Sequence, residues 1–182
     1  MQAMNRKLQQ HNLMEEYQVP DSDVRRYFQM MGSIAFVPEE DVPTAWRFLK
    51  PLLPADMTEF GDYFESTWIG TSSRNPTFAH YMWNLHDSTK MLLPRSSSIS
   101  EGWHHGFHFM IPCSHSTIWK FLDCLKSEQD LTDVKLTKRL CREAQKRRAA
   151  KWIKYNQRLQ TVVDAYEDYD MLDFLKVIGC MI

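Results

Sequence analysis

The stretch RSSSISEGWHHGFHF, residues 95–109, decides the fold class because its side chains repeat with the period of an α-helix. Large apolar residues recur at the spacing i, i+4, i+8 and i+11, which places them on one helix face: Ile99, Trp103, Phe107 and Met110. A carboxylate and two imidazoles fall on the opposite face: Glu101, His105 and His108. The stretch therefore predicts an amphipathic helix with chemically active side chains on its outer face.

The same helical period extends along most of the chain. Only six glycines occur, and no segment alternates apolar and polar residues as a half-buried strand would. Capping residues and prolines mark helix ends, for example Asp21 or Ser22 before one helix, and Asp41 with Pro43 at the start of the next. Helices are expected over residues 1–17, 22–34, 41–52, 57–69, 78–92, 98–110, 118–125, 131–166 with an interruption near Arg148, and 170–180. The sequence predicts an all-α protein.

Length and composition are those of a single domain with a buried core. The chain has 182 residues, of which 43% are hydrophobic, and a net charge of −1. Because it contains neither a run of about 18 apolar residues nor a signal-peptide pattern, we expect a non-secreted protein with no membrane span. Four cysteines occur without Cys-x-x-Cys pairing, which predicts reduced intracellular thiols: Cys113, Cys124, Cys141 and Cys180.

The near-neutral net charge conceals one strongly basic segment. Residues 131–160 contain ten Lys and Arg against only Asp133 and Glu143, whereas the rest of the chain is acidic overall. Such a localised excess indicates contact with a polyanion. A solvated helix face is the plain alternative, but few acidic residues are present to pair with these cations at i, i+4.

The sequence KLTKRLCREAQKRRAAKWIKYNQR, residues 135–158, supplies the candidate nucleic-acid contacts. On a helix, Lys135 and several of the following cations lie on one broad face, and Trp152 and Tyr155 are available for stacking. A DNA backbone contact or a nuclear-import signal fits this pattern. The candidate DNA-binding residues are Arg95, Lys138, Arg139, Arg142, Lys146, Arg147, Arg148 and Lys151.

Glu101 has two interpretations from local sequence alone. Ser98-Ile-Ser-Glu101 fits a capping box, in which the glutamate accepts a hydrogen bond from the Ser98 N–H, and this is favoured over a catalytic role. A zinc site is less favoured, because structural zinc sites use two separated pairs of ligands. The candidate zinc ligands are better explained as surface or helix-cap residues: His104, His105, His108, Cys113 and His115.

Residues 94–129, PRSSSISEGWHHGFHFMIPCSHSTIWKFLDCLKSEQ, closely resemble the C-terminal part of Mutator-like element (MULE) transposases of the animal type. The family pattern runs approximately Pro-Arg-Thr-Asn-Asn-Ser-Ile-Glu-Gly-Trp-His and then Cys-Ser-His-Pro-Thr-Ile-Trp-Lys-Phe. Weaker likeness covers residues 2–17, 35–49 and 62–70. Glu101 matches the glutamate of the family's Asp-Asp-Glu set, with Arg95, Trp103 and His104 as matching neighbours.

The resemblance implies a ribonuclease-H-like transposase in the nucleus that cuts and joins DNA with two Mg²⁺ or Mn²⁺ ions. Hard cations of this kind favour carboxylate ligands, and one ion activates the nucleophile while the other stabilises the leaving oxygen. By this resemblance Glu101 is both a metal ligand and a catalytic residue, and His104 is a catalytic candidate that contacts the scissile phosphate or supports the glutamate. Residues 1–93 resemble the family's helical insertion, residues 94–129 hold the glutamate motif, and residues 130–182 form a basic helix and a tail helix.

Two departures from the family pattern change the functional expectation. The family's two aspartates and its Cys-x-x-His motif would precede a position that matches Met1, and Thr-Asn-Asn is replaced by Ser96-Ser97-Ser98. No other acidic pair matches; Glu59, Asp62 and Glu65 fit a solvated face. We therefore expect a DNA-binding fragment or derivative of such a transposase, catalytically incomplete alone and compatible with a homo-oligomer. The alternative is a host-adopted all-α module that binds protein or RNA.

Overall fold

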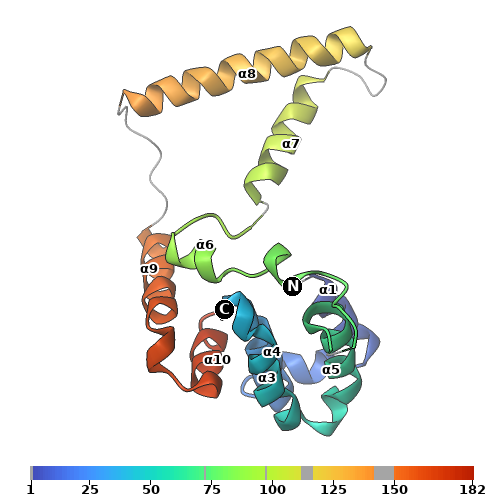
Figure 1. Cartoon of the computed structure of the whole chain (residues 1–182). Helices are drawn as coiled ribbons and strands as arrows, with labels where there is room; N and C mark the ends of the chain where they lie inside the picture. Colours follow the sequence, from blue (N-terminus) through green and yellow to red (C-terminus); the bar gives the residue numbers. More distant parts are fainter. Residues whose placement is uncertain (1, 72, 97, 112–116, 142–149) are drawn as a thin grey trace. The chain divides into compact units, whose positions relative to one another are not determined.

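The computed structural model describes residues 2–71, 73–96, 98–111, 117–141 and 150–182, and these residues are helical with connecting turns (Figure 1). The predicted all-α class is confirmed. No β-strand occurs within the described ranges, where the only sheet-like feature is an isolated bridge between Thr71 and Arg74. The expected ribonuclease-H-like relation has no support from these helices.

The chain divides into two compact units, one discontinuous and one continuous. Unit 1 comprises Met1–Leu93 and Ile153–Ile182, and unit 2 comprises Pro94–Trp152. Unit 1 contains α1 (Gln2–Gln10), α2 (Met14–Gln18), α3 (Asp23–Ser33), α4 (Val42–Leu49), α5 (Thr58–Phe64), α6 (His86–Lys90), most of α9 (Ala150–Asp164) and α10 (Met171–Gly179). Unit 2 contains α7 (Ser98–Met110) and α8 (Ile118–Leu140).

Unit 1 contains the hydrophobic core. All members of the buried cluster lie in residues 1–93 or 153–182, and its largest fully buried side chains include Phe28, Phe60 and Phe174. In unit 2, Phe107 is the one buried hydrophobic residue among those described. Unit 1 therefore has the apolar burial that stabilises a domain, and unit 2 has little of its own.

The C-terminal helix α10 packs antiparallel against α3. The two helices approach closely at a glycine of α10 and at a serine of α3. A Cβ on Gly179 would lie 3.4 Å from the backbone carbon of Gln29 and the backbone nitrogen of Met30. At the other end of the contact, the buried Ser33 hydroxyl lies 2.9 Å from the carbonyl oxygen of Leu175, to which it donates. The last residues of the chain are thus built into the core that residues 23–33 begin.

Several helix boundaries agree with the sequence prediction. Ser22 caps α3, because its hydroxyl accepts a hydrogen bond from the Arg25 N–H at 3.1 Å. The expected helix 57–69 is found as α5 followed by a π-helix over Glu65–Ile69. Asp41 does precede α4, but its carboxylate caps no helix N–H and instead accepts a hydrogen bond from the Tyr166 hydroxyl at 2.8 Å.

Three expected helices are wrong in extent. Residues 1–17 form α1 and α2 with a break between them, where Asn12 has a φ of 57°. The predicted helix 78–92 is only a 3₁₀ turn over His80–Met82 and the short α6. The long helix expected from 131 begins earlier, since α8 runs from Ile118, and it ends at Leu140.

Candidate nucleic-acid interface

The basic segment lies on two helices, α8 and α9. Its described cations are Lys135, Lys138 and Arg139 on α8 and Lys151, Lys154 and Arg158 on α9, and all six are exposed. Four of the predicted DNA-binding residues lie outside the described ranges: Arg142, Lys146, Arg147 and Arg148.

On α8 the cations gather near the C-terminus. Lys138 and Arg139 lie in the last turn, where positive charge interacts favourably with the partial negative charge of the helix end. Neither forms an ion pair with a carboxylate from the residues that the structure describes. Both side chains are exposed.

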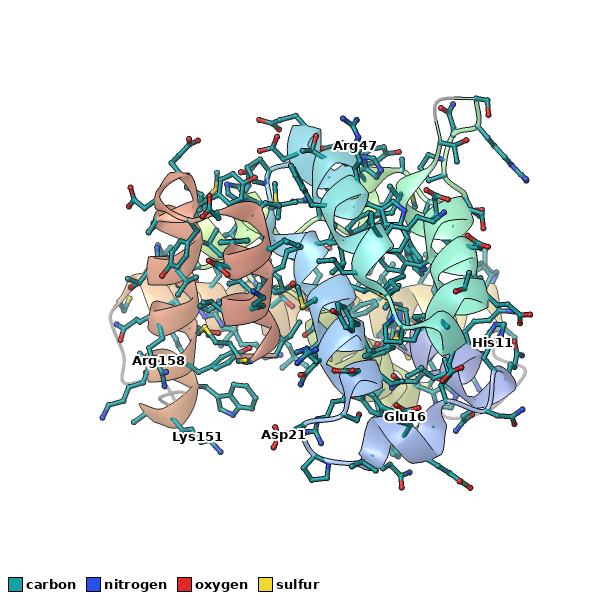
Figure 2. The ribbon with its side chains drawn as sticks, turned by 90° about the horizontal axis from the view of Figure 1, so that it is seen from below. His11, Glu16, Asp21, Arg47, Lys151 and Arg158 are labelled. Atoms are coloured by element: carbon teal, nitrogen blue, oxygen red, sulfur yellow. The ribbon has the colours of Figure 1, made fainter. Side chains whose placement is uncertain are left out.

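On α9 three cations share one face. Lys151, Lys154 and Arg158 follow one another at i, i+3 and i+7, so the stripe extends about 10.5 Å along the helix axis. Figure 2 shows Lys151 and Arg158 on this helix with their side chains directed away from the ribbon. The opposite face is anchored in the core by the buried residues Leu159 and Val163. The amphipathic pattern thus fixes the basic face outward.

The α9 stripe is nearly free of acidic neighbours on its own helix. Asp164, at the last position, is the one acidic residue between 150 and 164. None of the three cations makes an ion pair with any residue placed in 2–71, 73–96, 98–111, 117–141 or 150–182.

Two aromatic residues lie near these cations on α9. Trp152 is 60% exposed beside Lys151, and Tyr155 is half-buried. Cations together with an exposed indole are the combination that a nucleic-acid backbone and its bases contact.

Lys154 and Arg158 were not among the predicted binding residues. Both are within the quoted basic segment, but the sequence has its densest run of cations before residue 152. The signal that identifies them is the i, i+3, i+7 spacing from Lys151, which requires only that α9 be helical.

The glutamate motif lies on α7, whose apolar face packs on α8. The ring planes of Trp103 and Phe107 are stacked with centroids 5.2 Å apart, and Phe107 meets Phe121 of α8 edge-on at 5.8 Å. The Trp103 Nε1–H donates to Glu128 Oε1 at 3.1 Å. The predicted stripe is therefore confirmed for Trp103 and Phe107. Met110 is half-buried, and the side chain of Ile99 lies outside the part that the structure describes.

Glu101 occupies the first turn of α7 and is exposed. A carboxylate there is favoured by the positive end of the helix dipole. The helix begins at Ser98, and residue 97 lies outside the described residues, so the capping box at Ser98 and Glu101 stays a prediction. Ser98 and Ser96 hydroxyl oxygens are 2.7 Å apart.

The histidines of α7 point to solvent, and the described part of the motif does not bring further acids to Glu101. The ring of His104 meets that of Trp103 at 4.9 Å, and His105 meets Phe109 at the same separation. Arg95 is half-buried just before the helix. No group of three or more His, Cys, Asp or Glu side chains that could hold a metal ion occurs among the described residues. Cys113 and His115, considered above for zinc, lie outside them.

The expectation that Glu59, Asp62 and Glu65 form a solvated face is wrong for Glu65. Its carboxylate accepts hydrogen bonds from the Trp46 Nε1–H at 2.9 Å and from Lys50 Nζ at 2.7 Å. Lys50 also lies 3.1 Å from Asp62. The hydrogen bond to Glu65, followed by that to Asp62, raises the pKa of Lys50 against the opposing effect of burial. This network joins α4 to α5 and the π-helix and is structural.

No family model, curated protein or solved structure matches this chain. The longest apolar stretches of the described helices are too short or too charged to cross a lipid bilayer.

Proposed function

We propose that this protein is a nuclear, DNA-binding derivative of a Mutator-like transposase that lacks part of the catalytic site. The resemblance of residues 94–129 to the glutamate-bearing end of these transposases motivates the proposal. The helical conformation of both α7 and the regions that resemble the family's insertion is consistent with it.

One observation carries the DNA-binding part of the proposal: the exposed cation stripe of α9. Three cations without carboxylate partners in the described chain raise the local positive potential. A phosphate backbone relieves that potential, and the counterions released from the DNA favour binding. Because such contacts reach phosphates and not base edges, we expect affinity with little sequence preference.

The catalytic part of the proposal concerns Glu101 and His104. In the reaction implied by the resemblance, Mg²⁺ or Mn²⁺ would activate the nucleophile and stabilise the leaving oxygen. Glu101 would supply one carboxylate from an exposed position on the first turn of α7, and His104 would lie beside it on the same helix. One carboxylate is fewer than two ions require, so the chain alone is proposed to bind DNA without cutting it.

The experiment is a salt titration of binding to a fluorescent duplex. If about five cations contact phosphates, the logarithm of the association constant should fall against the logarithm of the salt concentration with a slope of about −4.5. Replacing Lys151, Lys154 and Arg158 with Gln should flatten the slope by about 2.7, since each phosphate contact contributes about 0.9. Gln keeps the helix propensity of these positions.

A matched control removes three positive charges that lie outside the α9 stripe. The exposed residues Arg6, Arg47 and Arg74 lie on α1, on α4 and in the loop after the π-helix. Their replacement with Gln should change the slope by less than about 0.5, because no phosphate contact is lost. A slope near zero for the parent protein would overturn the proposal.

The exposed apolar residues of α7 and α8 favour a second candidate function, a protein-interaction module. Phe109 is 76% exposed, Trp119 is 74% exposed and no residue of α8 is buried. Large exposed apolar side chains of this kind mark contact surfaces. A homo-oligomer that dissociates on Trp119→Ser, together with a DNA-binding slope near zero, would favour this function over DNA binding.

A further inference from the structure

A groove between α9 and α10 is lined by two cations and by mostly apolar side chains. It has a volume of about 600 Å³ and lies wholly within unit 1. Both helices contribute to the lining: Arg158, Thr161 and Val162 from α9, and Lys176, Val177, Cys180 and Met181 from α10 and the residues after it. Figure 2 shows the two helices side by side, with Arg158 at the outer surface of α9.

The two cations of the groove differ in their ion pairs. Arg158 has no ion-pair partner in the described chain, and Lys176 Nζ lies 3.0 Å from Asp173 Oδ1. Both members of that pair are more than half exposed, at 54% and 61%, and such solvent-exposed pairs contribute little energy. The Thr161 hydroxyl donates to the Gln157 carbonyl oxygen at 2.9 Å, so it adds no free donor. The acidic groups nearest along the two helices are Asp164 and Asp173.

We propose that this groove binds one backbone phosphate of DNA between Arg158 and Lys176, an inference that rests on the proposed function. The guanidinium of Arg158 is suited to bidentate contact with phosphate oxygens, and the ammonium of Lys176 acts as a point charge from the other side. The apolar side chains of Val162 and Val177 offer a surface for the deoxyribose. The groove makes α10 part of the DNA-binding surface.

The position of the groove continues the stripe of α9. Arg158 is both the last cation of that stripe and the first residue of the groove. The stripe spans about 10.5 Å. In the proposed arrangement Lys154 and Lys151 contact the backbone next to the phosphate that is held in the groove.

The first test changes charge in both directions. Arg158→Gln should flatten the salt slope by about 0.9, and Lys176→Gln should do the same. Asp173→Asn should instead strengthen DNA binding by about two- to threefold at 50 mM salt, because Lys176 then has no competing carboxylate. A purely structural role for Asp173 would not produce tighter binding.

Two variants are the matched controls for this test. Arg47→Gln removes one exposed cation from α4, and Glu59→Gln removes one exposed carboxylate from α5, where it pairs with His11 at 3.2 Å. In Figure 2, His11 and Arg158 lie at opposite sides of unit 1. Neither control should alter the DNA affinity by more than about 1.5-fold, because neither residue lines the groove and salt screens exposed charges that make no direct contact with DNA.

Cys180 gives a readout inside the groove. In a variant whose other three cysteines are serine, a duplex should slow the reaction of Cys180 with a charged thiol reagent at least fivefold, and Arg158→Gln should remove most of this protection. Protection by inorganic phosphate alone, equal to that by DNA at the same phosphate concentration, would identify a free-anion site and overturn the DNA assignment.

The failures of the two proposals are distinguishable. If the parent chain binds DNA with a steep salt slope but Arg158→Gln, Lys176→Gln and Asp173→Asn have no effect, the groove proposal is wrong and the proposed function stands. If the parent chain has no salt-dependent DNA binding, both are wrong.

Discussion

Removal of residues 94–152 should leave unit 1 folded. These 59 residues form unit 2, and none of them belongs to the buried cluster that forms the core. The two chain segments of unit 1 are already joined near the excision point, because the Gln160 side-chain amide donates to the Lys90 carbonyl oxygen at 2.6 Å. The core should therefore form without unit 2.

A linker of ten Gly and Ser residues between Leu93 and Ile153 is long enough. Ile153 lies seven residues before Gln160 on α9, which is about 10.5 Å along the helix. A flexible linker of ten residues has a root-mean-square span of about 16–19 Å. The replacement does not need to strain α6 or α9.

The expected change in stability is small and favourable. Shortening the connection from 59 residues to ten reduces the loop-closure entropy by at most about 1.6 kcal/mol. For a domain of this size that corresponds to a rise in Tm of up to about 6 °C. By contrast, Phe174→Ala removes a fully buried core ring and should lower the free energy of unfolding by about 3–5 kcal/mol.

Thermal unfolding followed by near-UV circular dichroism is the assay, with Phe174→Ala as the variant that shows its sensitivity. The excised protein should retain a cooperative transition and the aromatic signal of the native chain. Loss of that signal, or a fall in Tm of more than about 10 °C, would refute the argument that unit 1 contains a self-sufficient core.

Further predictions concern single residues. Burial, and then the hydrogen bond to Asp41, raise the pKa of Tyr166. Its contribution to stability is therefore complete below pH of about 10 and is lost progressively as the pH rises from there towards the raised pKa; Tyr166→Phe should flatten this alkaline loss in denaturant titrations. Gly179→Val should destabilise the α3–α10 contact by about 1–3 kcal/mol, measured by urea unfolding, because even a Cβ there meets the α3 backbone at 3.4 Å. Ser22→Ala should cost about 1 kcal/mol in the same assay, through loss of the α3 cap. With Mg²⁺ or Mn²⁺ the purified chain should not nick supercoiled DNA; nicking that Glu101→Ala abolishes would show that the catalytic site is complete.

The features that the sequence predicts well depend on neighbours close in the chain. The cap at Ser22 needs only the next three residues, and the stripe of Trp103 and Phe107 follows from the helical period. Pro43 likewise indicates the start of α4. In each case one local rule determines the outcome.

The features that the sequence does not predict depend on residues that are far apart in the chain. Asp41 is a good capping residue, yet its carboxylate binds Tyr166, 125 positions away. Glu65 reads as solvated until Trp46 and Lys50 are placed beside it. For the candidate site, Lys151 is predictable from charge alone, whereas the pairing of Arg158 with Lys176 across a groove requires the packing of two helices. Tertiary packing overrides local preference at these positions.

The two units differ in how much of their apolar surface is buried, and this difference bears on which unit could carry each part of the proposed function. In unit 2, α8 has 23 residues and none of them is buried, so its stability comes mainly from helix propensity and from the few aromatic contacts that α7 makes with it. The glutamate motif on α7 therefore packs against a helix that has no buried residue. The helix α9, which carries the cation stripe, is instead held in the core of unit 1 by Leu159 and Val163. Catalysis requires a carboxylate held to within a fraction of an ångström, whereas backbone phosphate contacts tolerate looser positioning. Under the proposed function, Lys154 and Arg158 would contact DNA from unit 1, which holds the core, and Glu101 would lie on the less buried unit 2.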